Sequence, residues 1–283
     1  MTVELVTTLL ANGLVVGTTI ALTALGLTLI FGIMHVVNLA HGEFYAMGAY
    51  FTWAAYKVTD NFWISAVAGI ALAAVVGTAL LMIFYNRLSN AGPLRWALLT
   101  LGMGYVLREL AQLVFGTDFK LIAPPLEGSI PWVGGVYRAT MTLAGIALIV
   151  VLALFLKKTR YGILIRAIAS NRNAAAVAGV STRRIYTWVA LISAGLAAAA
   201  GAFMLPVTSA YPTMGLEIMI MAFVVVVVGG MGNIQGTLIA SVAAGMAQSL
   251  LTLVVQPTTA NLAVLVSFML VLVARREGLQ KLW

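Results

Sequence analysis

The sequence predicts an all-α integral membrane protein, a polytopic helical bundle of about 8–9 transmembrane segments in one domain over residues 1–283. Two observations support this fold class. Hydrophobic residues make up 62% of the chain and charged residues only 8%, whereas soluble domains have about 25% charged residues. The apolar residues also form successive runs of about 17–25 residues, the length of a helical span, and do not alternate with polar residues as in outer-membrane strands.

Nine apolar windows follow one another and are expected to be helices. Three of them, 141–156, 217–231 and 261–274, are 16 residues or fewer, shorter than the roughly 20 residues of an upright span. Some of these helices are therefore expected to be tilted, extended, broken or re-entrant. The windows lie at residues 9–31, 37–56, 63–84, 96–116, 141–156, 185–205, 217–231, 237–255 and 261–274.

The basic residues predict the orientation. The gap at about 157–184 has seven basic residues and no acidic residue, and the positive-inside rule places such a loop in the cytoplasm. Alternation then puts the N-terminus outside, the 117–140 loop outside and the C-terminus inside. The net charge of +8 is explained by this topology, and no nucleic acid is expected as a partner. The seven are Lys157, Lys158, Arg160, Arg166, Arg172, Arg183 and Arg184.

The stretch "NLAHGEFYAMGAY" brings polar residues into an apolar region. At helical spacing Asn38, His41 and Tyr45 share one face, and Glu43 lies roughly opposite. Ionisable groups at membrane depth usually face a bundle interior or a cavity, so the segment is either packed on all sides or broken near Gly42. We expect these five residues to border a translocation pathway; the alternative is that they only bond neighbouring helices.

A second stretch, "VVGGMGNIQG", joins two apolar windows through four glycines and no charge. Gly229, Gly230, Gly232 and Asn233 are expected to form either a tight turn or a break within a helix, because glycine adopts backbone conformations closed to other residues.

The basic loop is long enough to hold a helix of its own. Ser170 or Asn171 can cap a short helix over residues 173–178, and Gly179 can end it in the left-handed conformation. Ser181 or Thr182 can cap the next span. The alternative is a solvated loop without a helix.

The sequence has no sign of an enzyme. It has no G-x-x-x-x-G-K-[ST] nucleotide loop and no G-x-S-x-G nucleophile turn, and its two histidines cannot form an H-E-x-x-H site. With no cysteine, thiolate metal sites are excluded as well. No cofactor or metal is expected in this chain, so any use of ATP falls to a partner subunit.

Three segments of the sequence resemble the signature regions of the branched-chain amino-acid ABC-transporter permeases, of the type without a fused ATPase. The resemblance runs in register over nearly the whole chain, and the "NLAHGE" core with the preceding "GLTLIFGI" is its most specific part. The segments are "GTTIALTALGLTLIFGIMHVVNLAHGEFYAMGAY", "YGILIRAIASNRNAAAVAGVSTRRI" and "VVVVGGMGNIQGTLIAS".

The resemblance implies a multi-pass permease subunit of a binding-protein-dependent importer in the bacterial inner membrane. Its implied partners are two cytoplasmic ABC ATPase subunits, a second, related permease chain and an external solute-binding protein, in contact with membrane lipid. The implied solute is small and polar, a branched-chain amino acid in the first place and urea or a short amide in the second. A proton-coupled carrier using Glu43 and His41, and a passive channel, are the competing functions.

The resemblance also implies a coupling site in the basic loop. Ala175, Ala176 and Gly179, with Asn173 beside them, lie in the coupling helix that docks in a groove of the ATPase, and Arg166 and Arg183 flank it. The chain departs from the family pattern in two places. It has "SNRN" where many members have an acidic residue before the Ala pair, and "RREGL" at 275–279 where R-P-x-G-L is usual.

Overall fold

The computed structural model describes residues 3–88, 92–130 and 134–274. These residues form eleven helices and one short antiparallel ribbon, β1 (Ser129–Ile130) and β2 (Gly134–Gly135). The "RREGL" segment lies outside the described residues. The helices are α1 (Val3–Met34), α2 (His41–Thr59), α3 (Phe62–Leu88), α4 (Pro93–Phe115), α5 (Val136–Lys158), α6 (Arg160–Ser170), α7 (Arg172–Val177), α8 (Thr182–Thr208), α9 (Met214–Gly229), α10 (Ile234–Leu251) and α11 (Pro257–Ala274).

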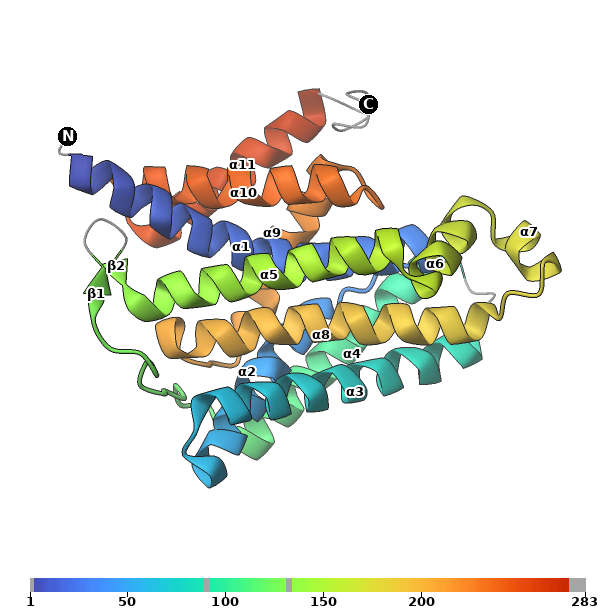
Figure 1. Cartoon of the computed structure of the whole chain (residues 1–283), viewed down its shortest axis with the longest axis horizontal. Helices are drawn as coiled ribbons and strands as arrows, with labels where there is room; N and C mark the ends of the chain where they lie inside the picture. Colours follow the sequence, from blue (N-terminus) through green and yellow to red (C-terminus); the bar gives the residue numbers. More distant parts are fainter. Residues whose placement is uncertain (1–2, 89–91, 131–133, 275–283) are drawn as a thin grey trace.

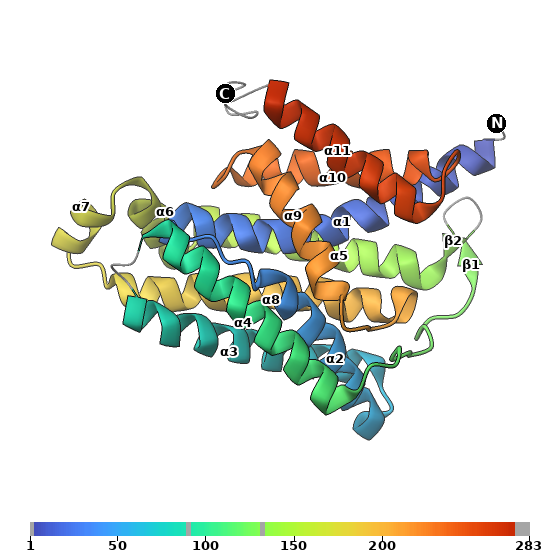
Figure 2. The same ribbon diagram turned by 180° about the vertical axis from the view of Figure 1, so that it is seen from behind.

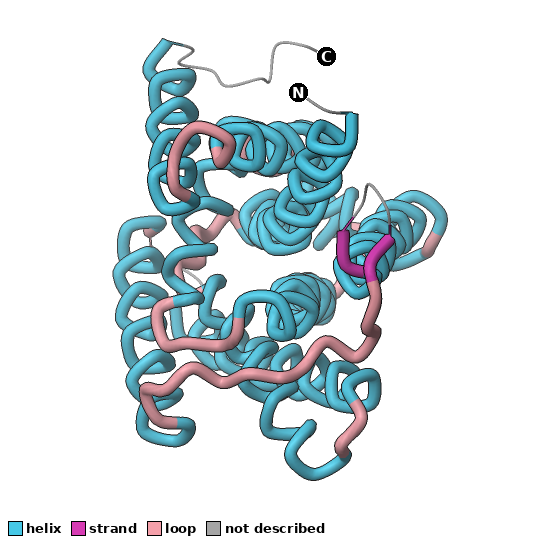
Figure 3. Tube along the Cα trace, turned by 90° about the vertical axis from the view of Figure 1, so that its left-hand side faces the viewer, coloured by secondary structure: helices cyan, strands magenta, loops and turns pink. Residues whose placement is uncertain are grey.

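The long helices share one direction. Helices α1, α3, α5, α8 and α10 run along the long axis of the molecule (Figure 1), while α2, α4 and α9 cross them obliquely on the face seen in Figure 2. The N-terminus and the β ribbon lie at one end of the bundle, and α6 and α7 lie at the other (Figure 1). The view along the bundle shows the loops gathered over the end that holds the ribbon (Figure 3).

Six helices in the described chain are long and apolar enough to cross a membrane: α1, α3, α4, α5, α8 and α10. Helices α9 and α11 are also apolar, but their apolar stretches are only 10–17 residues long. The predicted polytopic helical class is therefore confirmed. The finer count of about 8–9 segments and the N-out, C-in orientation stay predictions.

Two predicted windows have different bounds in the structure. The 141–156 window is part of α5, which has 23 residues, so this short window belongs to an extended helix, one of the alternatives that the sequence left open. The helix extends past its apolar run through polar residues that can lie near the ends of a span, Tyr137 and Arg138 at its start and Lys157 and Lys158 at its end. The 217–231 window corresponds to α9, which is short, with 16 residues.

Small residues let the helices approach closely. Ala194, Ala198 and Ala202 on α8 are fully buried, and a Cβ at Gly48 of α2 would collide with the backbone of Ala198. In membranes the hydrophobic effect does not pull helices together, so such contacts between small side chains provide much of the packing energy. This packing holds the start of α2 in the centre of the bundle.

Candidate functional site

Six residues between α1 and α2 are not helical and lie against α4. His35 has a positive φ of 55°, and the chain then runs back toward the middle of the bundle (Figure 2). The Thr100 hydroxyl on α4 accepts a hydrogen bond from the Leu39 N–H at 3.0 Å and lies 3.2 Å from the Val37 carbonyl. Irregular backbone at membrane depth requires such partners, because no water or lipid group can replace them there. The polar stretch "NLAHGEFYAMGAY" thus begins in the non-helical residues between α1 and α2.

Asn38 and His41 are completely buried. The Asn38 Oδ1 accepts a hydrogen bond from the Ala40 N–H at 3.2 Å, and the His41 Nε2 lies 3.0 Å from the Thr23 carbonyl on α1, to which it can donate. The His41 ring also meets Phe44 edge-on, with ring centroids 5.8 Å apart. The Asn38 Nδ2 and His41 Nδ1 atoms are buried without a hydrogen-bond partner in the described residues.

Glu43 points to a different neighbour, as the helical spacing predicts. Its Oε1 accepts a hydrogen bond from the Arg108 Nη2 of α4 at 3.0 Å, and both side chains are largely buried. A buried ion pair of this kind removes the cost of an isolated charge at membrane depth. The sequence allowed a segment that is packed on all sides or one that is broken near Gly42. At Glu43 the segment is packed on all sides.

Gly42 has another role than the predicted bend. It lies within the first turn of α2, and the break falls at residues 35–40 instead. A Cβ at Gly42 would collide with the Gly215 carbonyl and with Met219 on α9. Gly42 is needed because α2 and α9 touch there, and the expectation of a bend at this residue was wrong.

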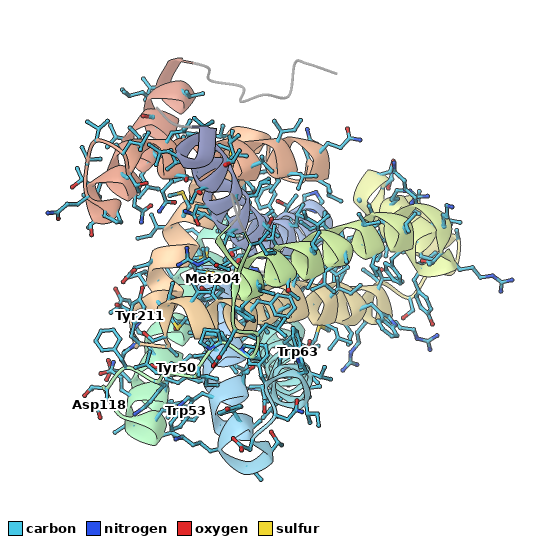
Figure 4. All side chains as sticks on the ribbon, turned by 60° about the vertical axis from the view of Figure 1, so that its left-hand side comes forward. Tyr50, Trp53, Trp63, Asp118, Met204 and Tyr211 are labelled. Carbon is cyan, nitrogen blue, oxygen red and sulfur yellow. The ribbon has the colours of Figure 1, made fainter. Side chains whose placement is uncertain are left out.

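Tyr45 lines a cavity of about 260 Å³, together with Tyr211 and Glu217. The Tyr211 hydroxyl donates a hydrogen bond to the Glu217 Oε2 at 2.8 Å. Burial raises the pKa of Tyr211 above its ordinary value, so the hydroxyl is protonated and can donate. Figure 4 shows Tyr211 at the end of the bundle that carries the β ribbon, on the same side of the view as Asp118. Of the five predicted pathway residues, Tyr45 is thus the one that lines this cavity.

The glycine stretch between α9 and α10 is a tight turn. Gly230 and Gly232 have positive φ angles of 93° and 88°, which only glycine adopts at little cost. The Asn233 side chain accepts hydrogen bonds from the N–H groups of Gln235 and Gly236, both at 3.1 Å, and so caps α10. Gly229 packs directly against the backbone of Gly236. The alternative of a break within one helix is excluded.

The basic loop contains the predicted short helix, α7. Asn171 is its N-cap, and its Oδ1 accepts a hydrogen bond from the Ala174 N–H at 2.9 Å. The helix ends in a Schellman motif: the Val180 N–H bonds to the Ala175 carbonyl and the Gly179 N–H to the Ala176 carbonyl, each at 3.0 Å. Gly179 has a φ of 83°. The expected cap and the expected left-handed glycine are both confirmed.

Most of α7 projects from the end of the bundle (Figure 1). Among the predicted coupling residues of this segment, Ala175 is buried. The exposed ones are Asn173, Ala176 and Gly179, together with the flanking Arg166 and Arg183. Asn173, Ala176 and Gly179 thus lie on the exposed side of the α7 segment, whereas Ala175 faces inward. Their contact with an ATPase stays a prediction.

Two further residues of α7 were not among the predicted coupling residues. Val177 is 91% exposed, an unusual position for an aliphatic side chain at the tip of a helix. Arg172 connects α7 to the bundle, since its guanidinium lies 3.3 Å from the Tyr85 hydroxyl and 5.6 Å from the ring of Tyr186. The helical period of "RNAAAV" places Val177 on the opposite face from Ala175. The exposure of Val177 could therefore have been predicted once Asn171 was taken as the helix cap.

Helix α6 was also missed. Thr159 caps it by accepting a hydrogen bond from the Gly162 N–H at 3.0 Å, a Ser/Thr capping signal that can be recognised in the sequence. Among the residues that the structure describes there is no group of three or more His, Cys, Asp or Glu side chains that could hold a metal ion.

These features define a class: a polytopic helical membrane protein with a short capped helix exposed at one end and a cavity between its helices that contains a carboxylate. Residues 9–274 match the family described as "Branched-chain amino acid transport system / permease component". The chain belongs to this family. It is therefore a multi-pass membrane permease.

Three relatives show how far the similarity extends. The high-affinity branched-chain amino acid transport system permease protein LivH of Escherichia coli K12 is 28% identical over 84% of this chain and 83% of its own length. The corresponding protein BraD of Pseudomonas aeruginosa is 28% identical over 85% and 84%. A probable branched-chain amino acid transport permease LivH of Methanocaldococcus jannaschii is 29% identical over 86% and 80%.

Proposed function

We propose that this chain is the transmembrane subunit of a binding-protein-dependent ABC importer that carries branched-chain amino acids across the bacterial inner membrane. The observation that carries the proposal is α7, a capped helix that stands out from the bundle with Val177 91% exposed. A rigid helix in a loop rich in basic residues suits transmission of force from a cytoplasmic partner. The family match and the relatives named for branched-chain amino acids support the substrate class.

The partners follow from the same proposal. Two ATPase subunits bind ATP and engage α7, an external binding protein delivers the solute, and a second, related permease chain completes the pathway. The chain itself is not an enzyme, because its match is to a permease component. ATP acts only through the ATPase subunits.

A proton-coupled carrier is less well supported. Glu43 is held by Arg108 at 3.0 Å, and the His41 Nε2 is held against the Thr23 carbonyl at 3.0 Å. A carrier would need at least one of these groups to exchange protons with water during transport. Both are instead enclosed by packed helices.

Reconstitution tests the function directly. The complete transporter in vesicles, with its binding protein outside and ATP on the α7 side, is expected to accumulate radiolabelled leucine. The same complex with an ATPase that cannot hydrolyse ATP is the control. Uptake of leucine by this chain alone under a proton gradient would establish a carrier instead, and ATP-driven uptake of urea without leucine would move the chain to the short-amide substrate class.

A further inference from the structure

The cavity beside Tyr45 is where six helices or their connections converge. It has a volume of about 260 Å³, below the roughly 300–1,000 Å³ of pockets for drug-sized ligands, and so suits a smaller solute. Val16, Thr19 and Ile20 on α1 lie near the middle of that helix, so the cavity reaches well into the bundle. Its lining is Val16, Thr19, Ile20, Tyr45, Met204, Thr208, Tyr211, Met214, Glu217, Ile218, Met221, Gln248 and Asn261.

The cavity has a carboxylate without a cation. The two Glu217 oxygens accept hydrogen bonds from the Tyr211 hydroxyl at 2.8 Å and the Thr213 hydroxyl at 3.0 Å. These bonds fix the direction of the carboxylate and leave its charge in place. The lining contains no Lys, Arg or His, and Glu217 forms no ion pair within the described part of the chain. Glu217 is exposed, so a solute can reach its carboxylate, and a carboxylate held in place by two hydrogen bonds attracts an ammonium group.

Two side-chain amides also line the cavity. Gln248 of α10 and Asn261 of α11 both line the cavity. The Asn261 Oδ1 is buried without a hydrogen-bond partner among the described residues, and a buried polar atom without a partner costs about 1–3 kcal/mol. The unpaired Oδ1 is an acceptor and calls for a donor such as the ammonium group of a zwitterion, whereas the N–H donors of the two side-chain amides can bind its carboxylate.

Much of the remaining lining is apolar and adaptable. Met204, Met214 and Met221 contribute three methionines, with Ile20 and Ile218 beside them. Methionine fills irregular space and accommodates side chains of different branching. Such a wall suits aliphatic side chains and discriminates only weakly among them, since one methylene changes affinity by about 1–3 kcal/mol.

We propose that this cavity is a binding site for an aliphatic α-amino acid within the permease, with the ammonium group at Glu217, the carboxylate at Gln248 and Asn261, and the side chain against the methionines. The proposal rests on the proposed function and adds the place where the solute pauses inside the bundle. Neither member of the buried Glu43–Arg108 pair lines this cavity.

Transport by variants of the complete transporter provides the first test. Glu217→Gln is expected to lower leucine uptake about tenfold, equivalent to about 1.4 kcal/mol, while ATP hydrolysis stimulated by the loaded binding protein continues. Glu109→Gln is the matched control, because Glu109 is an exposed acid on α4 whose carboxylate pairs with Gln112 at 3.3 Å. Equal leucine uptake by the two variants would overturn the site.

Protection of a cysteine provides a second test that does not require Glu217 to be changed. The chain has no cysteine, so Thr208→Cys places a single thiol at the cavity wall, and Asp118→Cys places one on the outer loop as a control. In the purified complex without binding protein, leucine is expected to slow labelling of Thr208→Cys several-fold. Isocaproate, which has the same side chain but no ammonium group, should not. Equal protection by both compounds, or by neither, would refute the proposal.

The two proposals fail in different ways. If the unchanged transporter does not carry leucine, the proposed function fails before any variant is compared. If the unchanged transporter carries leucine, but Glu217→Gln behaves like Glu109→Gln and leucine does not protect Thr208→Cys, the function stands and the cavity is not the site.

Discussion

Arg108 on α4 donates a hydrogen bond to Glu43 on α2 at 3.0 Å, with side chains that are 12% and 6% exposed. Helix α4 also contacts the bundle through Thr100 and Phe115, but most of its large apolar side chains are exposed. The pair therefore fixes α4 against the start of α2. The Arg108 Nε has no hydrogen-bond partner in the described structure, so the guanidinium depends on Glu43 for its compensation.

Glu43→Gln is expected to destabilise the subunit, because it leaves the Arg108 charge buried without a counter-charge. Breaking such a pair by removing one partner costs about 3–5 kcal/mol. The measurement is the thermal unfolding midpoint of the purified subunit in detergent. Arg108→Gln in the Glu43→Gln background should recover most of the loss, since both charges are then gone.

A contrary result would be clear. If Glu43→Gln unfolds at the temperature of the unchanged subunit but transports poorly, the carboxylate acts in transport and the structural role assigned here is wrong. Glu109→Gln, on the same helix as Arg108 but exposed, controls for the loss of an acid in general.

The second prediction concerns Gly42. Gly42→Ala should destabilise the subunit by about 1–3 kcal/mol, because its Cβ would push into the Gly215 carbonyl of α9. Gly102→Ala on α4 is the matched control: nothing lies within 4 Å of its Cβ position, and alanine is the better helix former. Unfolding midpoints of the two variants decide the point, and a Gly42→Ala subunit as stable as Gly102→Ala would refute the close contact.

The sequence predicts the local features of this protein well and its long-range contacts poorly. The cap at Asn171, the left-handed Gly179 and the turn at Gly230 and Gly232 depend on neighbouring residues alone, so their residue types predict them. The partner of Glu43 is 65 positions away along the chain, and no local pattern points to Arg108.

The break before α2 shows the same limit. Glycine is the usual sign of a break, and Gly42 attracted that interpretation, but the non-helical residues 35–40 contain no glycine. They are held out of the helix by the Thr100 hydroxyl of α4 at 3.0 Å from the Leu39 N–H, a contact that exists only once the helices have packed. The cavity likewise combines residues that are distant in sequence, since Thr19 on α1 and Tyr45 on α2 line it together with Glu217 on α9.

The third prediction tests the orientation. The basic loop should face the cytoplasm, so Asn173→Cys on the exposed α7 should resist thiol reagents that do not cross the membrane of intact cells. Asp118→Cys, at the end of the bundle away from α7, should react readily. After the membrane is permeabilised both should react. Labelling of Asn173→Cys in intact cells with a sealed inner membrane would reverse the predicted topology.

The last prediction concerns the end of α7. Gly179 has a φ of 83° and open space where a Cβ would lie, so a substitution there changes the backbone preference without a steric clash. A β-branched residue is strained in this conformation by about 1–2 kcal/mol or more, whereas asparagine tolerates it. Gly179→Val should therefore distort the Schellman motif and lower both leucine uptake and binding-protein-stimulated ATP hydrolysis in the assembled transporter, and Gly179→Asn should retain most of each. Because the unfolding midpoint depends mainly on the bundle, it should stay nearly constant in both variants. Full activity of an assembled Gly179→Val transporter would show that the shape of this helix end does not matter for coupling.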